Sequence, residues 1–416
     1  MFNDERRMKN PLAGALARAR FRRQPAPVRF AIADEVDFLN GAHWDAVTAH
    51  RGLFLQRSYL RELHAVRPAN VDLRFALLYR AAEPVAALAM QLVAIDGRTL
   101  GKPSPKAGLR GLVARAVGGV VERLATRVLV VGNLLTYGNH GIAIRPGLEA
   151  DRDVWHGIGE AAYRVRRAEK HTGRTDFVLV KDLADGELAQ SALLRELGFR
   201  PVETEPDMVL TLGEGWTSHA DYLAALAAKY RKNVRKSVLE PIDAARLTVR
   251  RLDDVAAHAP RLQELYLAVH GNAALRPVTL GVDYWHALAR SAGDRGRFAV
   301  IARDDRLLGF VVTLREDEDT AIGYHIGFDR EAAAELPLYL RLLHCTIEDG
   351  IALGARCISL GRTALEPKAM LGAKPRPLHV WVRHRQPVLN KLMRGLLVRI
   401  HHAEAPERNA LATKSG

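Results

Sequence analysis

An internal repeat constrains the fold of this chain more than any other feature of its sequence. Residues 75–90 and residues 298–313 each consist of an apolar run, a short polar turn and a second apolar run. This pattern predicts a β-hairpin in both segments. Two further pairs of matching segments follow in the same order along the chain: 175–183 with 355–363, and 193–212 with 368–384. Three ordered matches indicate that one folding unit has been duplicated.

The order of elements predicts an α/β fold for each copy. A helix, a hairpin, a strand, a helix, a strand, a short helix and a final strand form a mixed sheet flanked by helices. The 416 residues suit two domains of this kind. We expect a basic N-terminal arm, two domains and a flexible tail, with these bounds: 1–27, 28–213, 214–400 and 401–416. The first copy is longer by about 43 residues, which we expect between residues 93 and 128 as an insertion at 94–127.

Charge narrows the choice of partners. Lys and Arg number 61 against 47 Asp and Glu, which gives a formal net charge of +14. Nucleic acid, an anionic membrane surface or an acidic donor such as CoA or acyl carrier protein would match this excess. A generally Arg-rich composition would explain it without any partner. Only Cys345 and Cys357 are present, without the spacing of a metal site. No apolar run approaches the ~20 residues of a membrane span, and we expect a cytoplasmic protein.

Three short segments resemble a known family. Residues 197–200 read Leu-Gly-Phe-Arg before an expected strand, residues 222–241 form an expected basic helix, and residues 357–372 pass from a strand through Gly-Arg to a lysine. They resemble the Fem-type (FemAB-related) tandem-GNAT acyltransferases, over roughly residues 28–400. The resemblance implies an α/β fold (α+β mixed sheets) of two tandem GNAT-like domains facing one cleft. It also implies transfer of an acyl or aminoacyl group to an amine, from acyl-CoA, an acyl carrier protein thioester or aminoacyl-tRNA.

The sequence departs from the GNAT pattern at the loop that binds pyrophosphate. That loop has a basic residue followed by a Gly-x-Gly/Ala step at a helix N-terminus. Residues 143–162 contain glycines at a different spacing, and residues 325–340 have no glycine after Asp329. Both departures put an ordinary mode of CoA binding in doubt.

Candidate catalytic residues lie on two expected strands. Acyl transfer to an amine needs a base, donors to the oxyanion and an acid for the leaving group. The strand at 321–328 carries Tyr324, a candidate acid, and His325, a candidate base. Neighbouring strand residues point to opposite faces, so only one of the two should face the cleft. In the first copy the corresponding strand is expected at 128–144, and we place His140 near the substrate. Simple packing, or a turn around Gly138, would explain these residues without catalysis.

Candidate substrate-binding residues gather near the same strands. Tyr137 and Asn139 belong to the glycine-rich segment around His140. Four more follow an expected strand, at the end where α/β sheets tend to place ligands: Arg362, Thr363, Glu366 and Lys368. The arginine and the lysine could hold a phosphate or a carboxylate. A solvated loop is the alternative.

The basic helix offers a site for an anionic donor. Helical spacing puts Lys229, Lys232 and Lys236 on one face, and Arg231 and Arg235 on another, with no acidic residue among them. Such a run is often only a solvated face, but it also favours an anionic partner.

Two further segments, 106–127 and 387–400, combine an apolar stripe with a basic face. They could pack on their own domains or lie in an anionic membrane interface, which would make the protein peripheral on the inner face of the membrane. The leading hypothesis is an N-acyltransferase that uses a thioester co-substrate, acyl-CoA or acyl carrier protein, with a lipid-like substrate and without a bound cofactor or metal. Its rivals are an aminoacyl-tRNA-dependent transferase, which is less favoured, and a binding protein that has kept only the fold.

Overall fold

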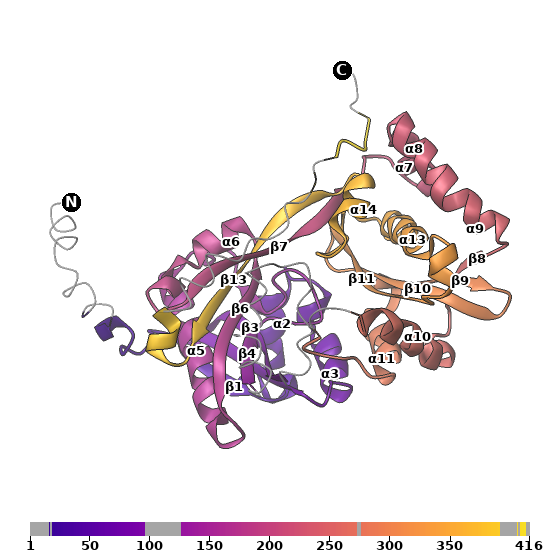
Figure 1. Ribbon diagram of the computed structural model, residues 1–416. Coiled ribbons are helices and arrows are strands. Elements are labelled where there is room, and N and C mark those ends of the chain that lie inside the picture. The colour runs from indigo at the N-terminus through magenta and orange to yellow at the C-terminus, as the bar shows by residue number, and fades with distance from the viewer. Residues whose placement is uncertain are drawn as a thin grey trace.

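The computed structural model describes residues 16, 19–95, 126–272, 276–391, 406 and 408–412. Figure 1 shows two lobes, with the long strands β7 (Arg200–Thr211) and β13 (Lys374–His384) running between them. The strands form one mixed sheet of thirteen, in the order β1-β2-β3-β4-β6-β13-β7-β12-β11-β10-β9-β8, and β5 pairs with β3 outside this path. The α/β fold expected from the sequence is confirmed.

The first half contains six strands besides β7. They are β1 (Arg29–Ala33), β2 (Val71–Arg80), β3 (Glu83–Ile95), β4 (Thr126–Val131), β5 (Ile142–Ile144) and β6 (Thr175–Leu183). The helices of this half are α2 (Gly41–Thr48), α3 (Arg57–Ala65), α5 (Arg152–Ala168) and α6 (Asp185–Gln190). The Asp151 side chain caps α5 by accepting hydrogen bonds from the backbone N–H groups of Asp153 and Val154.

The second half contains five strands besides β13. They are β8 (Thr248–Arg251), β9 (Gly296–Arg303), β10 (Arg306–Arg315), β11 (Thr320–Phe328) and β12 (Cys357–Ser359). Its helices are α7 (His219–Ala225), α8 (Ala228–Val234), α9 (Glu240–Ala244), α10 (Val255–His270), α11 (Asp283–Ala292), α12 (Ala332–Glu335), α13 (Leu338–Ala352) and α14 (Leu365–Met370). The two expected hairpins are present as β2–β3 and β9–β10.

The last strand of each half completes the sheet of the other half. β13 lies between β6 and β7, with Val382 opposite Leu179 of β6 and Val380 opposite Val202 of β7. β7 in turn pairs with β12 of the second half. The strand order therefore reads alike from both ends, as duplication predicts, but the last strands have changed places.

Helices cover both faces of this sheet. α5 and α13 pack on one side of their own half sheets, whereas α2, α3, α10 and α11 contribute to a single core that runs through both halves. In that core Phe54 of the first half packs against Tyr324 of the second, with ring centroids 5.4 Å apart. A shared sheet and a shared core thus fix the two halves relative to each other.

Three details of the sequence prediction need correction. The extra length of the first half does not lie wholly between β3 and β4, because residues 132–151 are also longer than their counterpart 329–337. The expected strand 128–144 ends at Val131, where Gly132 adopts φ +142° and a loop follows. The expected flexible tail is packed at its described end, since Leu411 forms a β-bridge with Leu226 and Ala410 is buried.

Candidate active site between the two halves

A polar cleft lies where the two halves meet, with a volume of about 170 Å³. The first half lines it with a segment around Arg51, with the loop that follows β4, and with the end of β6. The second half adds the turn after β10 and the end of β12. The cleft's charged and hydroxyl side chains are His50, Arg51, Tyr137, His140, Asp182, Glu187, Glu316, Asp317, Thr320, Ser359 and Arg376.

The buried ion pair of the cleft joins the two halves. His140 Nδ1 lies 3.3 Å from Glu316 Oε1, and both side chains are about nine-tenths buried. His140 Nε2 lies 2.6 Å from the backbone oxygen of Tyr137. A carboxylate and a carbonyl oxygen can only accept hydrogen bonds, so both ring nitrogens of His140 face acceptors. Burial acts to raise the pKa of Glu316, but the hydrogen bond and charge of His140 outweigh it and lower that pKa to about 2.

Gly52 makes room for Glu316. Its neighbour Leu53 donates a backbone hydrogen bond of 2.8 Å to the Glu316 carbonyl oxygen, which docks the segment on the end of β10. A Cβ atom on Gly52 would overlap with Glu316 Oε1 and with that carbonyl oxygen. Only glycine therefore fits this close approach between the halves.

Asp317 follows Glu316 in the chain, and its pKa shifts in the opposite direction. Its Oδ1 accepts backbone hydrogen bonds from Asp319 (2.9 Å) and Thr320 (2.7 Å). Burial, and then the hydrogen bond and charge of Glu316, raise the pKa of Asp317. Two neighbouring carboxyl groups whose pKa values move apart are suited to an acid–base role. Sequence reasoning missed both residues, because the acidic run at 316–319 has the composition of a solvated turn.

The second charged contact between the halves lies at the end of β6. Asp182 is fully buried with φ +60°, and it forms ion pairs with Lys181 and with Arg362. The Arg362 guanidinium also lies 5.7 Å from the ring centre of Tyr137. The structure thus brings the predicted residues Tyr137, Asn139 and His140 to the cleft, and Arg362 directly behind it.

The remaining predicted residues after β12 separate from one another. Lys368 is only 3 % exposed and forms no hydrogen bond or ion pair with a described residue. Burial lowers its pKa to about 8, although the charges of Asp207 and Glu205 oppose this shift. Asp207 accepts hydrogen bonds from Ser359 Oγ (2.8 Å) and from the backbone of Gly361 (3.1 Å), so Lys368 lies behind the cleft wall. Thr363 and Glu366 are exposed, and Glu366 pairs with Arg408 at 2.7 Å.

Tyr324 and His325 do not alternate as a regular strand would require. Val312 of β10 pairs with His325, whereas the next residue pairs with Gly323, so Tyr324 is the extra residue of a β-bulge. Both rings therefore contact Tyr284: its hydroxyl lies 2.5 Å from that of Tyr324, and its ring centre lies 6.0 Å from that of His325. The regular alternation on which the prediction of a single cleft-facing residue was based is therefore absent at this point of β11.

Neither residue lines the cleft. Tyr324 is joined through Tyr59 and Asn133 to a buried polar network, and burial raises its pKa well above the ordinary value. Burial and the charge of His270 lower the pKa of His325 to about 3, and its Nε2 is buried without a hydrogen bond. Their catalytic roles stay predictions.

The expected basic helix is divided into α7, α8 and α9, with a π-helical turn at Arg235–Leu239. Figure 1 shows it along the outer edge of the second lobe. All five predicted cations are exposed, and Arg235 pairs with Glu240 at 3.0 Å. Arg231 donates to two backbone carbonyls. In the described residues no carboxylate pairs with the three lysines: Lys229, Lys232 and Lys236.

Most of both amphipathic segments lies outside the described residues, namely 96–125 and 392–405. Their contact with a membrane or with their own domains therefore stays a prediction. Within the described helices, none has the length and apolar character needed to cross a membrane.

Comparisons with known proteins agree with this architecture. Residues 228–369 match the family model described as "Acetyltransferase (GNAT) domain". The solved structure of FemX superposes with a TM-score of 0.53 at 10 % sequence identity, over 85 % of this chain and 98 % of that one. No protein of curated function matches the sequence.

Two further solved structures are similar at lower TM-scores. A tandem GNAT protein from the clavulanic acid biosynthesis pathway gives 0.49 at 14 % identity, over 86 % of this chain and 99 % of that one. The C-terminal domain of a putative lysylphosphatidylglycerol synthetase from Agrobacterium fabrum gives 0.45 at 11 % identity, over 86 % and 96 %. The GNAT resemblance expected from the sequence is thus confirmed for residues 228–369, and the chain has a fold like that of FemX.

Proposed function

We propose that this protein is an N-acyltransferase that moves an acyl group from a thioester donor, acyl-CoA or acyl carrier protein, to an amine bound in the cleft between its halves. The observation that carries the proposal is the carboxyl pair of Glu316 and Asp317. An amine acceptor arrives as an ammonium ion, and buried carboxyl groups attract it and can take its proton.

Each member of the pair has a distinct task in this proposal. Asp317, whose pKa is raised, accepts the proton that the amine must lose before it attacks. Glu316 stays ionised because of His140, and holds the loop of the first half against the second. His140 then holds Glu316 in place rather than acting as the base itself. Arg51 and Arg376, on the cleft wall, would bind an anionic group of the acceptor.

The donor would enter from the side of β11. β12 is short, Cys357–Ser359, and pairs with β11 only from Thr320 to Ile322, which leaves the rest of β11 without a paired strand on that edge. Backbone N–H groups along such an opening, and at the bulge of Tyr324, are suitable donors to a carbonyl oxygen that becomes negative during transfer. Tyr137 lies near this edge, since it packs on Gly361. Burial raises the pKa of Tyr339 in the first turn of α13, and Tyr137 adds to this effect. Arg362 would bind a phosphate or carboxylate group of the donor.

A second candidate is an aminoacyl-tRNA-dependent transferase, as the Fem-type resemblance implies. The exposed and unpaired lysines of α8 and its π-helical turn favour it, because phosphodiesters would neutralise them. A lipid-like substrate would instead depend on the amphipathic segments at 106–127 and 387–400.

Release of free thiol from acyl-CoA and from acyl carrier protein thioesters, measured with a panel of amines, tests the proposal. We expect turnover by the purified protein and a loss of about 10²-fold or more in kcat with Asp317→Asn, in line with removal of a general base. Glu318→Gln is the matched control, since this exposed carboxylate directly follows the pair in the chain and its loss should leave kcat unchanged. Turnover only with aminoacyl-tRNA, abolished by RNase, would replace the first proposal by the second.

A further inference from the structure

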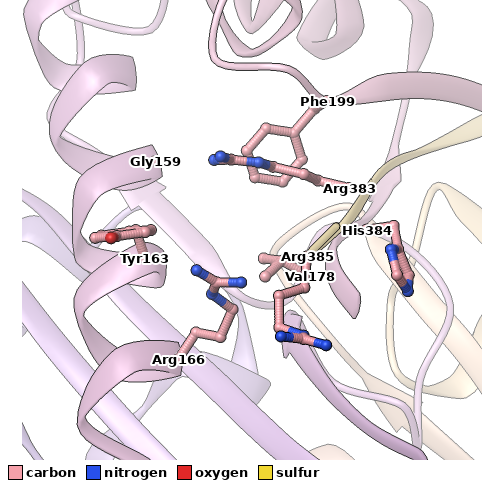
Figure 2. Close-up of a pocket in the computed structure, with 8 residues that line it drawn as sticks. All are labelled: Gly159, Tyr163, Arg166, Val178, Phe199, Arg383, His384 and Arg385. Atoms are coloured by element: carbon pink, nitrogen blue, oxygen red, sulfur yellow. The ribbon is translucent and has the colours of Figure 1, made fainter. Parts of the chain in front are cut away.

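A cluster of arginines on the first half forms a second polar pocket, away from the cleft. It lies between α5, β6 and the end of β13, and Figure 2 shows the side chains that line it. Arg166 projects from α5 into the space in front of β13, and Arg383 lies over the ring of Phe199, 5.7 Å from its centre. Arg385 lies just past the end of β13, and Tyr163 lies one helical turn before Arg166.

The charges of this pocket are not balanced by the described residues. Arg385 lies 3.2 Å from Asp176, and this carboxylate is also shared with Arg174 at 3.5 Å. Among the described residues no carboxylate forms an ion pair with Arg166 or Arg383; their contacts are with the rings of Tyr163 and Phe199. At least two positive charges of the pocket therefore have no carboxylate partner in the part of the chain that the structure describes.

The guanidinium groups also act on one another. Burial lowers the pKa of Arg383 to about 10, and the charges of Arg166 and Arg22 add to this effect. Burial lowers the pKa of Arg166 as well. The charge of Tyr163 opposes this shift, whereas the charge of Arg385 adds to it. Partly buried arginines that repel each other are costly without a counterion. An anion placed between them would remove both the repulsion and the desolvation cost.

We propose that this pocket binds a phosphate group, as the free ion or as the terminal group of a ligand. A phosphate dianion matches the two unbalanced charges, and its tetrahedral oxygens can accept from several guanidinium forks at once, whereas a carboxylate is satisfied by a single arginine. The empty space of the pocket is about 250 Å³, including its open mouth. One phosphate group therefore fits, and the rest of a larger ligand would stay outside.

Calorimetric titration with inorganic phosphate, at fixed ionic strength in chloride buffer, tests the proposal without any enzymatic assay. We expect saturable binding, and a rise in Kd of about tenfold or more in Arg383→Gln and in Arg166→Gln, since each loses a charge-assisted hydrogen bond. Arg166→Gln is the safer variant for folding, because Arg166 is not stacked on the Phe199 ring. Arg164→Gln is the matched control: it removes the same charge from the same helix, outside the pocket, and should bind like wild type.

The source of the phosphate group follows from two further probes, glycerol 3-phosphate and dihexanoyl phosphatidic acid below its micelle concentration. Tightest binding of inorganic phosphate indicates the free ion. Tightest binding of the phosphatidic acid, with the same loss in Arg166→Gln, indicates a lipid headgroup. Absence of saturable binding for all three probes, or equal Kd values in wild type and both pocket variants, would overturn the proposal.

Discussion

Replacing Glu316 by Gln should lower the free energy of unfolding, and the size of this loss should depend on pH. The folded structure lowers the pKa of Glu316 from 4.5 to about 2. Each pKa unit corresponds to about 1.4 kcal/mol of differential stabilisation, so the ionised carboxylate contributes about 3 kcal/mol at pH 7. This side chain is nine-tenths buried, and solvent screening therefore reduces the figure little.

The sign follows from the direction of the shift. A carboxyl group whose folded pKa is lowered stabilises the protein fully above its unfolded pKa, and this contribution is lost as pH falls from about 4.5 to about 2. The difference in unfolding free energy between wild type and Glu316→Gln should be about 3 kcal/mol at pH 7 and roughly 2 kcal/mol at pH 3.5. Urea unfolding followed by circular dichroism measures both values.

The control is Glu318→Gln, which removes an exposed carboxylate nearby and should change the unfolding free energy by less than about 0.5 kcal/mol at either pH. A difference for Glu316→Gln that is small at pH 7, or that does not shrink at low pH, would refute the argument. It would mean that the contact between Glu316 and His140 does not hold the halves together.

Three other changes follow from the same structure. Gly52→Ala should destabilise the protein by about 1–3 kcal/mol in urea unfolding, because its Cβ overlaps with Glu316, whereas Gly186→Ala, with open space around it, should be neutral. Lys368→Met should raise the unfolding free energy at pH 7 by up to about 3 kcal/mol, because a buried lysine with a pKa of about 8 must lose its proton or carry an unfavourable charge. This gain in unfolding free energy should fall as the pH rises from 8 towards 10.5. A loss of stability at pH 7 would contradict the prediction. Trp381→Ala should lower the unfolding free energy by about 3–5 kcal/mol, because this buried residue of β13 donates a hydrogen bond to Ser191 Oγ in the first half (2.8 Å). Calorimetry should show one transition for both halves, at a lower temperature than in wild type. Two separate transitions would contradict the exchange of strands.

Local pattern was sufficient to predict the hairpins and the order of elements, because period-two apolar runs and polar turns specify a strand pair by themselves. The exchange of last strands was beyond such reasoning. β7 and β13 have the same place in each repeat, and either could pair with β6 on sequence pattern alone. Which one does so is decided by tertiary contacts such as those of Trp381.

The cleft was predicted only in part, for a similar reason. The glycine-rich segment around His140 is unusual enough to mark a site, and the structure places it there. Glu316 and Asp317 belong to an acidic turn, and only the docking of the Gly52 segment from the other half buries them. Burial that depends on a distant segment leaves no local signal. The same holds for Tyr324, whose bulge changes the face that alternation would predict.

These contacts bear on how the cleft can work. His140 with Glu316 and Asp182 with Arg362 each join one half to the other across the cleft. The sheet and the core of Phe54 and Tyr324 are also continuous between the halves. Closure by rotation of one half against the other would break all of these at once, and unpaired buried charges are costly. We therefore expect the cleft to be largely preformed, so that substrate binding moves loops and side chains rather than whole domains.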